Sequence, residues 1–418
     1  MIEWSEQHLM IRDAVRKFVE AEIVPNLEAL EHGDLPPYGV LRKLFRTFGM
    51  DELGRARFDK QIAREEAAAR GDSAAERESA RAKKGESTRG RGDGLAMQLI
   101  PLIELSRFCP GMVTALGVSM GLTGASIMSK GTLDQKKRWG REILTLEKIG
   151  SWAITEPGSG SDAFGSMKST ARRTDDGGYV LNGNKTFITN GPFADIIVFI
   201  CKLDEAGVEP KDRKVLTFVL DSGMPGLTQS KPMRKMRLHS SPTGELFLQD
   251  VKVGVDRLLG GSEERSKGRE GAKDTFSMER SGVAAMAYGI VDRCLELSLK
   301  YAKERVQFGR PIGEFQLIQD KLARMVVARM NIENMLFRTI ESAELGRGLS
   351  FAEASAMKLY SARAATEVAL EAVQIYGGNG YMAEYQVEQL ARDAKALQIY
   401  AGTDEIQISA IARDLMAS

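Results

Sequence analysis

The stretch from Ser151 to Asn190, SWAITEPGSGSDAFGSMKSTARRTDDGGYVLNGNKTFITN, decides how the rest of the chain is interpreted. It opens with an apolar run, Trp152 to Thr155, that is typical of a β-strand and is broken at Glu156-Pro157. The following residues, Gly158 to Asp162, alternate glycine with short polar side chains. Such a pattern leaves backbone N–H groups open to a bulky anionic or planar ligand. Taken alone, it fits a ligand-binding loop and a plain loop between strands equally well.

Further strand signals surround this loop. Gly178 to Asn182 and Thr186 to Thr189 predict two strands joined by a turn at Asn182-Gly183-Asn184. From Ile196 to Val253, short β-branched and aromatic runs alternate with Gly, Pro and Asp turns, as in a small β-barrel or sandwich. We therefore predict a middle β domain over residues 151–260.

Helical patterns lie on both sides of this β domain. Ser5 is placed as the N-cap of a first helix, and the run Met112 to Met128, rich in Ala, Gly and Met, predicts a buried helix. Near the C-terminus, two long helices are predicted over about Phe315–Leu345 and Ala352–Tyr376. The predicted fold is α+β and mostly α, with an N-terminal helical domain (1–150), the β domain and a C-terminal four-helix bundle (271–418).

Residues 60–94 differ from the rest of the N-terminal region. Ile62 is the only Val, Ile or Leu between Lys60 and Gly94, so the segment lacks the side chains to form a core face. We predict a short helix followed by a mobile, charged insertion. Its Arg and Lys clusters at residues 79–92 are most simply a solvated surface, but they leave contact with an acidic partner open.

Composition argues against several classes of function. A chain of 418 residues is long enough for two or three packed regions, and its net charge of +1 gives no reason to expect nucleic acid or a membrane as partner. No apolar run approaches the roughly 20 residues of a membrane span. The N-terminus, MIEWSEQHLM, lacks the pattern of a secretory signal.

Cysteine and histidine usage point the same way. Three cysteines lie far apart in the chain, which suits buried thiols in a reducing cytoplasm better than disulfides. The three histidines share no ligand-like spacing, so we expect no metal site and no Ser-His-Asp triad. The residues are Cys109, Cys201 and Cys294, and His8, His32 and His239.

Four motifs, in this order along the chain, resemble those of the acyl-CoA dehydrogenases. The first joins Thr-Glu-Pro-Gly-Ser-Gly-Ser-Asp at 155–162 to Asn-Gly-Asn-Lys-Thr-Phe-Ile-Thr-Asn-Gly at 182–191 and is similar to the flavin-binding signature of that family. The others lie at 304–310, at 374–380, and at 392–395 with 399–403. The resemblance covers almost the whole chain apart from residues 51–95.

The resemblance implies FAD as cofactor and assigns residues to it. Phe187 stands where many relatives carry Trp, a change that keeps a flat aromatic partner for the flavin. The positions that match walls and hydrogen-bond partners of the isoalloxazine are Trp152, Ile154, Thr155, Phe187, Ile188 and Thr189. Those that match the pyrophosphate and adenosine site across a subunit interface are Arg305, Phe308, Gln316, Gln374, Gly377 and Gly378, with Thr403 and Glu405 as further FAD contacts. A shared site implies a homodimer or, as is usual in this family, a homotetramer.

Substrate positions follow from the same resemblance. Ser161 matches a position near the cofactor and thioester phosphates, and Phe276, Arg280 and Tyr400 match positions on the substrate side. The substrate is then an acyl-CoA, as in fatty acid and other lipid metabolism, and an electron-transferring flavoprotein is the implied electron acceptor.

The catalytic base is where the chain departs from many relatives. They carry a Glu directly before Gly-Thr, where this chain has Ala401, and an Ala side chain accepts no proton. Glu279 is the alternative, because it continues the apolar helical stripe of Val283 and Met286. A carboxylate on such a stripe is desolvated, which raises its pKa toward working pH. Glu279-Arg280 with Ala401 resembles the isovaleryl- and long-chain-type dehydrogenases.

We therefore predict α,β-dehydrogenation of an acyl-CoA thioester, with Glu279 as the base and flavin N5 as the hydride acceptor. Two rival classes stay open at this stage. One is a related enzyme that acts on a carrier-protein thioester or passes electrons to oxygen. The other is a flavin-binding relative without dehydrogenase activity that associates with DNA or a partner subunit. The basic tract at residues 79–92 and Ala401 are the features that suggest it.

Overall fold

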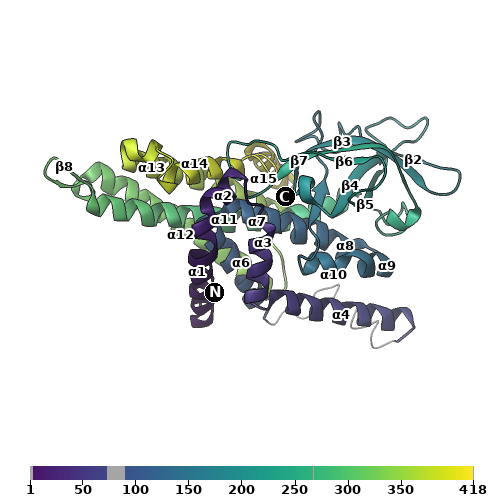
Figure 1. The fold of residues 1–418 in the computed structure, drawn as a ribbon, viewed down its shortest axis with the longest axis horizontal. Coiled ribbons are helices and arrows are strands. Elements are labelled where there is room, and N and C mark those ends of the chain that lie inside the picture. The colour runs from purple at the N-terminus through teal and green to yellow at the C-terminus, as the bar shows by residue number, and fades with distance from the viewer. Residues whose placement is uncertain (1–2, 73–89, 267, 418) are drawn as a thin grey trace.

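The structure is a computed structural model that describes residues 3–72, 90–266 and 268–417, excluding the side chains of Arg91 and residues 268–278. The helices from the two ends of the chain pack into one helical body, and the sheet of the middle region lies at one end of the molecule (Figure 1). The predicted sequence of helical, β and helical regions is confirmed.

The N-terminal region is helical, as predicted. Ser5 caps the first helix: its hydroxyl accepts from the His8 N–H, and the His8 ring accepts from the Ser5 N–H, a complete capping box. The elements are α1 (Glu6–Phe18), η1 (Val19–Ile23), η2 (Val24–Asn26), α2 (Leu27–His32), α3 (Tyr38–Thr47), α4 (Met50–Ala69), α6 (Arg91–Ser106), α7 (Pro110–Leu116), η3 (Gly117–Gly124), α8 (Ala125–Lys130), α9 (Leu133–Gln135), η4 (Lys136–Gly140) and α10 (Arg141–Leu144).

The charged segment is only partly as predicted. Helix α4 is 20 residues long and extends along one edge of the molecule (Figure 1). It packs against the protein through Phe58 and Ile62, both buried, and the Lys136 ammonium lies 2.7 Å from the Glu65 carboxylate. The short helix predicted at the start of residues 60–94 is the end of α4, but the expectation that this segment buries no core side chain was wrong at Ile62. Most of the predicted mobile insertion, residues 73–89, lies outside the described residues.

The predicted buried helix at Met112–Met128 is confirmed as the continuous run α7, η3 and α8. Among the described residues, Pro110–Lys130 is the one helix long and apolar enough to cross a membrane by length and composition. Because 67% of its most apolar window is buried inside the protein, it is a core helix. All three cysteines are free and buried, as expected.

The middle region forms one open sheet, so the predicted barrel is wrong. The seven described strands run in the order β1-β4-β2-β3-β7-β6, with β5 paired to β4, and the end strands β1 and β6 do not pair with each other. The two strands predicted at Gly178–Asn182 and Thr186–Thr189 are one longer strand, β3, which continues through its irregular central residues. The strands are β1 (Gly150–Ala153), β2 (Thr170–Arg173), β3 (Tyr179–Thr189), β4 (Ile196–Leu203), β5 (Val215–Asp221), β6 (Leu227–Gln229) and β7 (Thr243–Val253), with η5 (Gly191–Phe193) and η6 (Val255–Arg257) between them.

Strand β4 fixes the sheet against the helices. Its alternate side chains belong to two cores. Ile197 and Phe199 pack on one face of the sheet, in the core formed by the strands, whereas Ile196 and Val198 pack on the other face with Trp139 and the helices before the sheet. A strand buried on both faces needs an unbroken apolar sequence, and Ile196–Leu203 supplies one apart from Lys202.

The C-terminal region is a helical bundle built on three long helices. The predicted pair of long helices is confirmed within one residue at each end. Stacked Tyr301 and Tyr376 rings, 4.0 Å apart, join the ends of α11 and α13. The elements are α11 (Gly268–Glu304), β8 (Val306–Gln307), β9 (Arg310–Pro311), η7 (Ile312–Glu314), α12 (Gln316–Glu344), α13 (Phe351–Tyr376), η8 (Gly377–Tyr381), α14 (Gln386–Leu397) and α15 (Asp404–Ala417).

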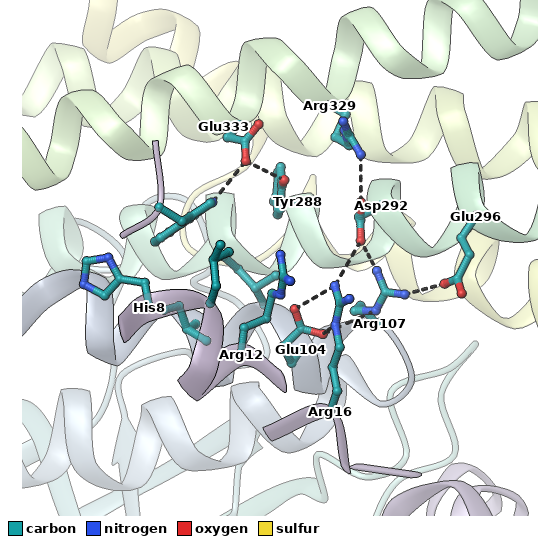
Figure 2. A pocket seen from close by; sticks show the side chains of 14 residues that line it. His8, Arg12, Arg16, Glu104, Arg107, Tyr288, Asp292, Glu296, Arg329 and Glu333 are labelled. Carbon is teal, nitrogen blue, oxygen red and sulfur yellow. Dashed lines mark hydrogen bonds and ion pairs between the residues drawn. The ribbon is translucent and has the colours of Figure 1, made fainter. Parts of the chain in front are cut away.

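A polar cavity of about 410 Å³ lies between α1, α6, α11 and α12 (Figure 2). Arg107 is at its centre, buried, with its guanidinium against Asp292, Glu296 and Glu104. Arg16 adds a hydrogen bond of 2.7 Å to Glu104. The charges that line the cavity neutralise one another, so this network joins the N-terminal helices to the bundle.

We predict that Arg107→Met lowers the free energy of unfolding by about 3 kcal/mol, because three carboxylates would lose their shared cation. The matched control is Arg12→Met: Arg12 also lines the cavity, but it donates its hydrogen bonds to the exposed Asp13, so the expected loss is below about 1 kcal/mol. Urea unfolding of both variants measures this. Equal losses in the two variants would contradict a structural role for the Arg107 network.

Candidate active site

The first motif forms a surface at the ends of β1 and β3. We call this surface the ledge, and it consists of Trp152, Ile154, Thr155, Phe187, Ile188 and Thr189. Lys185 is buried and its ammonium donates to the Ile154 carbonyl at 2.9 Å and to Glu156 at 2.8 Å. Glu156 also accepts the N–H groups of Lys168 and Ser169 at 2.6 and 2.9 Å. Burial opposes ionisation, but Lys185 and these N–H groups outweigh it and lower the pKa of Glu156. The charged pair thus fixes the backbone at Ile154 and Glu156.

Phe187 projects from this ledge. The pairing of β3 with β7 shifts register between Lys185 and Ile188, and within this bulge Phe187 adopts φ 56°. Its side chain is 66% exposed, whereas Ile188 is buried. The Thr186 N–H donates to the Thr155 carbonyl at 2.9 Å, so the residues that follow β1 lie beside β3. A strained bulge that holds an aromatic ring in the open fits a planar ligand such as a flavin.

The structure therefore brings together the residues predicted to surround the flavin ring. Trp152 and Thr155 are partly buried, Ile154 and Ile188 are buried, and Thr189 is partly buried at the end of β3. Asn190 attaches this ledge to the N-terminal helices: it accepts from the Tyr38 hydroxyl at 3.0 Å and donates to the Ala115 and Gly150 carbonyls at 2.9 Å.

The Gly/Ser loop is a compact turn. Glu156 and Ser159 exchange backbone hydrogen bonds of 3.0–3.1 Å, and the Ser159 hydroxyl lies within 3.0 Å of the Asp162 and Ala163 carbonyls. Ser161 stays exposed at the tip of this turn. Its hydroxyl is therefore open to a ligand, as the sequence predicts for a position near phosphates.

The second predicted set of FAD contacts lies at the other end of the molecule. Arg305 and Phe308 are on the hairpin formed by β8 and β9, which projects at the end opposite the sheet (Figure 1). Phe308 has φ 51° and is 95% exposed. Gln374, Gly377 and Gly378 are exposed where α13 ends, and Gln316 is exposed at the start of α12. One chain thus does not bring these residues to the ledge around Phe187.

Glu279 lies on α11, on the side opposite the polar cavity. Its position continues the stripe of buried Val283 and Met286, while Tyr288 and Asp292 face the cavity from the other side of the helix. Burial raises the pKa of Glu279 to about 7, and the nearby charges of Arg280 and Lys358 oppose this rise. The Arg280 guanidinium is held by α13, at 2.8 Å from the Ser355 hydroxyl and over the Phe351 ring.

The turn before α15 lies beside Glu279. Burial raises the pKa of Tyr400, as does the charge of Glu279, and the Tyr400 hydroxyl is 3.5 Å from the Met286 sulfur. Ala401 and Gly402 both have positive φ, 55° and 85°. Thr403 and Glu405 follow at the start of α15, where the Thr403 hydroxyl accepts from the Ile406 N–H. Phe276 lies on α11, but its side chain is outside the described residues.

Three residues that support the site were not predicted from the sequence. Lys185 and Glu156 support the ledge, and Lys358 contacts the turn at Gly402. A lysine within an otherwise small and apolar helix face, Ala354 to Ala362, was the available signal for Lys358.

Comparison with known proteins was decisive. Models of the N-terminal, middle and C-terminal domains of acyl-CoA dehydrogenase match residues 41–147, 151–251 and 266–416. The isovaleryl-CoA dehydrogenase of Arabidopsis thaliana is 31% identical over 414 residues, covering 99% of this chain and 92% of the relative. The chain belongs to the acyl-CoA dehydrogenase family.

Other relatives agree on the family and differ in subgroup. The short-chain specific acyl-CoA dehydrogenase of Megasphaera elsdenii is 37% identical over 317 residues, 76% of this chain and 81% of the relative. The solved butyryl-CoA dehydrogenase of the same organism is 31% identical, covers 100% of both chains and superposes with a TM-score of 0.80. These relatives therefore do not fix the isovaleryl/long-chain subgroup.

This acyl-CoA dehydrogenase is accordingly an FAD-dependent oxidoreductase that acts on the CH–CH bond of an acyl-CoA thioester. The exposed Phe187 in its bulge fits that cofactor. The rival interpretations, a carrier-protein enzyme or a non-dehydrogenating relative, are not favoured by the comparisons.

The raised pKa of Glu279 predicts a pH-dependent stability. A carboxyl group whose folded pKa is about 7 against an ordinary 4.5 stabilises the fold fully below pH 4.5 and loses that contribution as pH rises to 7. Relative to the parent, Glu279→Gln should therefore gain about 3 kcal/mol of unfolding free energy between pH 4.5 and 7.5. Urea midpoints across this range measure it, with exposed Glu52→Gln as the control. A constant difference between parent and Glu279→Gln would contradict a desolvated Glu279.

Proposed function

We propose that Glu279 is the catalytic base of the dehydrogenation. The observation that carries the proposal is its position: a half-buried carboxyl group on the apolar stripe of α11, beside Tyr400, where desolvation brings its pKa to about 7. At that value the carboxylate is populated at neutral pH and still basic enough to take the α-proton of a thioester. Bound FAD would supply the acceptor for the β-hydrogen as a hydride, which would leave the 2-enoyl thioester as product.

Tyr400 and Arg280 complete the proposed substrate side of the site. Tyr400 keeps its proton because its pKa is raised, so it presents a neutral wall beside Glu279. Arg280 opposes the rise in the pKa of Glu279 without contacting it as a hydrogen-bond partner among the described residues. Phe276 joins this set through the resemblance alone, and the exposed Ser161 is proposed to contact the phosphates.

We further propose that each FAD is bound by two copies of the chain. The ledge residues Trp152, Ile154, Thr155, Phe187, Ile188 and Thr189 would hold the ring system, with Thr403 and Glu405 nearby. The hairpin and α13 end, with Arg305, Phe308, Gln316, Gln374, Gly377 and Gly378, would hold the pyrophosphate and adenosine of a partner's FAD. The support is the separation of the two sets within one chain (Figure 1).

Exposed apolar side chains beside the hairpin support this assembly. Phe308, Leu317 and Tyr381 are 95%, 80% and 82% exposed, and Val327 and Met330 are exposed one turn apart on α12. Side chains of this size gain from burial against a second copy. We infer a homo-oligomer, a dimer or a homotetramer.

The remaining assignments are proposals of the same kind. The domain divisions at 1–150, 151–260 and 271–418 follow the change from helix to sheet and back. Three free, buried cysteines suit a reducing compartment, and we place the protein in the cytoplasm, in fatty acid or other lipid metabolism. An electron-transferring flavoprotein is the proposed acceptor of the electrons.

Glu279→Gln tests the base directly. The amide keeps the shape of the side chain and accepts no proton, so acyl-CoA should bind while flavin reduction slows at least about a hundredfold. Anaerobic stopped-flow absorbance with a panel of acyl-CoA chain lengths measures the rate. Adding Ala401→Glu in the Glu279→Gln background places a carboxylate on the adjacent turn and should restore part of the rate. Reduction as fast as the parent in Glu279→Gln would remove Glu279 from the mechanism.

Arg305→Ala tests the shared cofactor site. The exposed guanidinium is proposed to contact a partner's FAD, so its loss should lower flavin retention and loosen the oligomer together. Flavin absorbance and light scattering on the same sample measure both quantities. Lys300→Ala, another exposed cation at the end of α11, is the control. A monomer of the parent that holds full FAD would overturn the shared site.

A further inference from the structure

Lys358 is a buried cation beside the proposed base. Its side chain is 0% exposed and lies on the face of α13 that packs against α11. Phe351 and Ser355, up to two turns earlier on α13, hold the Arg280 guanidinium. Lys358 follows them along the helix, and its charge opposes the rise in the pKa of Glu279. Burial lowers the pKa of the Lys358 ammonium to about 8, so its positive charge is held in this place at a cost.

The ammonium also supports the turn at the site. Lys358 Nζ donates to the Gly402 carbonyl at 2.7 Å, and Gln407 Nε2 donates to the Gly402 and Ala401 carbonyls at 2.8 and 2.9 Å. Ala401 and Gly402 both adopt the left-handed conformation, which is unfavourable for Ala. These three hydrogen bonds therefore hold a strained turn, whose first residue is Tyr400, next to Glu279.

Charges of both signs surround Lys358, and that of Asp404 acts on it most strongly. Asp404 and Glu405 at the start of α15, and Arg280 and Glu279 on α11, are the charged groups that act on it. Asp404 already receives a hydrogen bond of 2.9 Å from Arg363, and Arg280 is held by Ser355. Among the described residues, the Lys358 ammonium donates its hydrogen bond to a neutral carbonyl. No contact ion pair there cancels its charge.

We propose that Lys358 is a positioning residue for the dehydrogenation: it holds the Tyr400–Gly402 turn and, through its charge, sets the pH range in which Glu279 accepts a proton. This inference rests on the proposed function, since it needs Glu279 as the base. Without the charge, Glu279 would stay protonated at higher pH, and the enzyme would lose activity at neutral pH.

Two neutral variants separate the charge from the hydrogen bond. Lys358→Gln keeps an N–H donor for the Gly402 carbonyl, whereas Lys358→Met removes both. In each, the acid limb of the pH profile of flavin reduction should move up by about one pH unit, so the rate below the parent's midpoint falls about tenfold. Flavin loss and a lower thermal midpoint should be larger in Lys358→Met, since only that variant frees the turn.

Charge-preserving and remote controls complete the experiment. Lys358→Arg should keep the acid limb of the parent, and Lys300→Met, an exposed cation on α11, should leave it unchanged. The pH dependence of urea unfolding gives a second measure that needs no turnover: the pH range over which Glu279 destabilises the fold should extend upward in Lys358→Gln.

The outcomes distinguish this inference from the base assignment. An acid limb that is abolished by Glu279→Gln but unmoved by Lys358→Gln would overturn the role of Lys358 and leave Glu279 as the base. A shift in Lys358→Arg as large as in Lys358→Gln would also overturn it, because the charge would then not matter. If Glu279→Gln reduces flavin like the parent, it is the proposed function that fails.

Discussion

The desolvation of Glu279 is the constraint on which the proposed chemistry depends. A carboxylate in water has a pKa near 4.3 and is a weak base, whereas burial on the stripe of α11 raises the pKa of Glu279 to about 7. This burial lowers the stability of the fold at neutral pH, and the surrounding structure must offset that loss. The long parallel packing of α11 on α13, fixed at one end by Arg280 and Ser355 and at the other by Tyr301 and Tyr376, provides the rigid support.

The two sides of α11 serve different purposes. Tyr288, Asp292 and Glu296 face a cavity in which acidic and basic groups neutralise one another and connect the helical regions (Figure 2). Glu279 faces the opposite side, where the nearby cations Arg280 and Lys358 oppose the rise of its pKa but donate their hydrogen bonds to other groups. A neutralised network gives stability, while a carboxylate left without a contact partner keeps its basicity. The difference follows from pairing, since the cavity carboxylates Asp292 and Glu296 have contact cations.

Much of this organisation was predictable from the sequence. Helical periodicity gave α12 and α13 within one residue, the Ser5 cap was confirmed, and the ordered motifs gave the family. Strand signals were less reliable: the bulge at Asn182–Gly183 was predicted as a turn, because an Asn-Gly pair inside a continuous strand has the sequence of a hairpin turn. The open sheet, Lys185 and Lys358 depend on contacts between segments far apart in the chain, which no local pattern records. The role of each predicted site residue stays a prediction until tested.

Proton abstraction is measured most directly with an acyl-CoA that has sulfur in place of its β-carbon and therefore no β-hydrogen to lose. Exchange of its α-hydrogen in D₂O, followed by mass spectrometry in the FAD-loaded enzyme, reports on the base alone. The account predicts rapid exchange in the parent with an acid limb near pH 7, and exchange slower by at least about a hundredfold in Glu279→Gln. Equal exchange in the two proteins would contradict the assignment of Glu279 as the base.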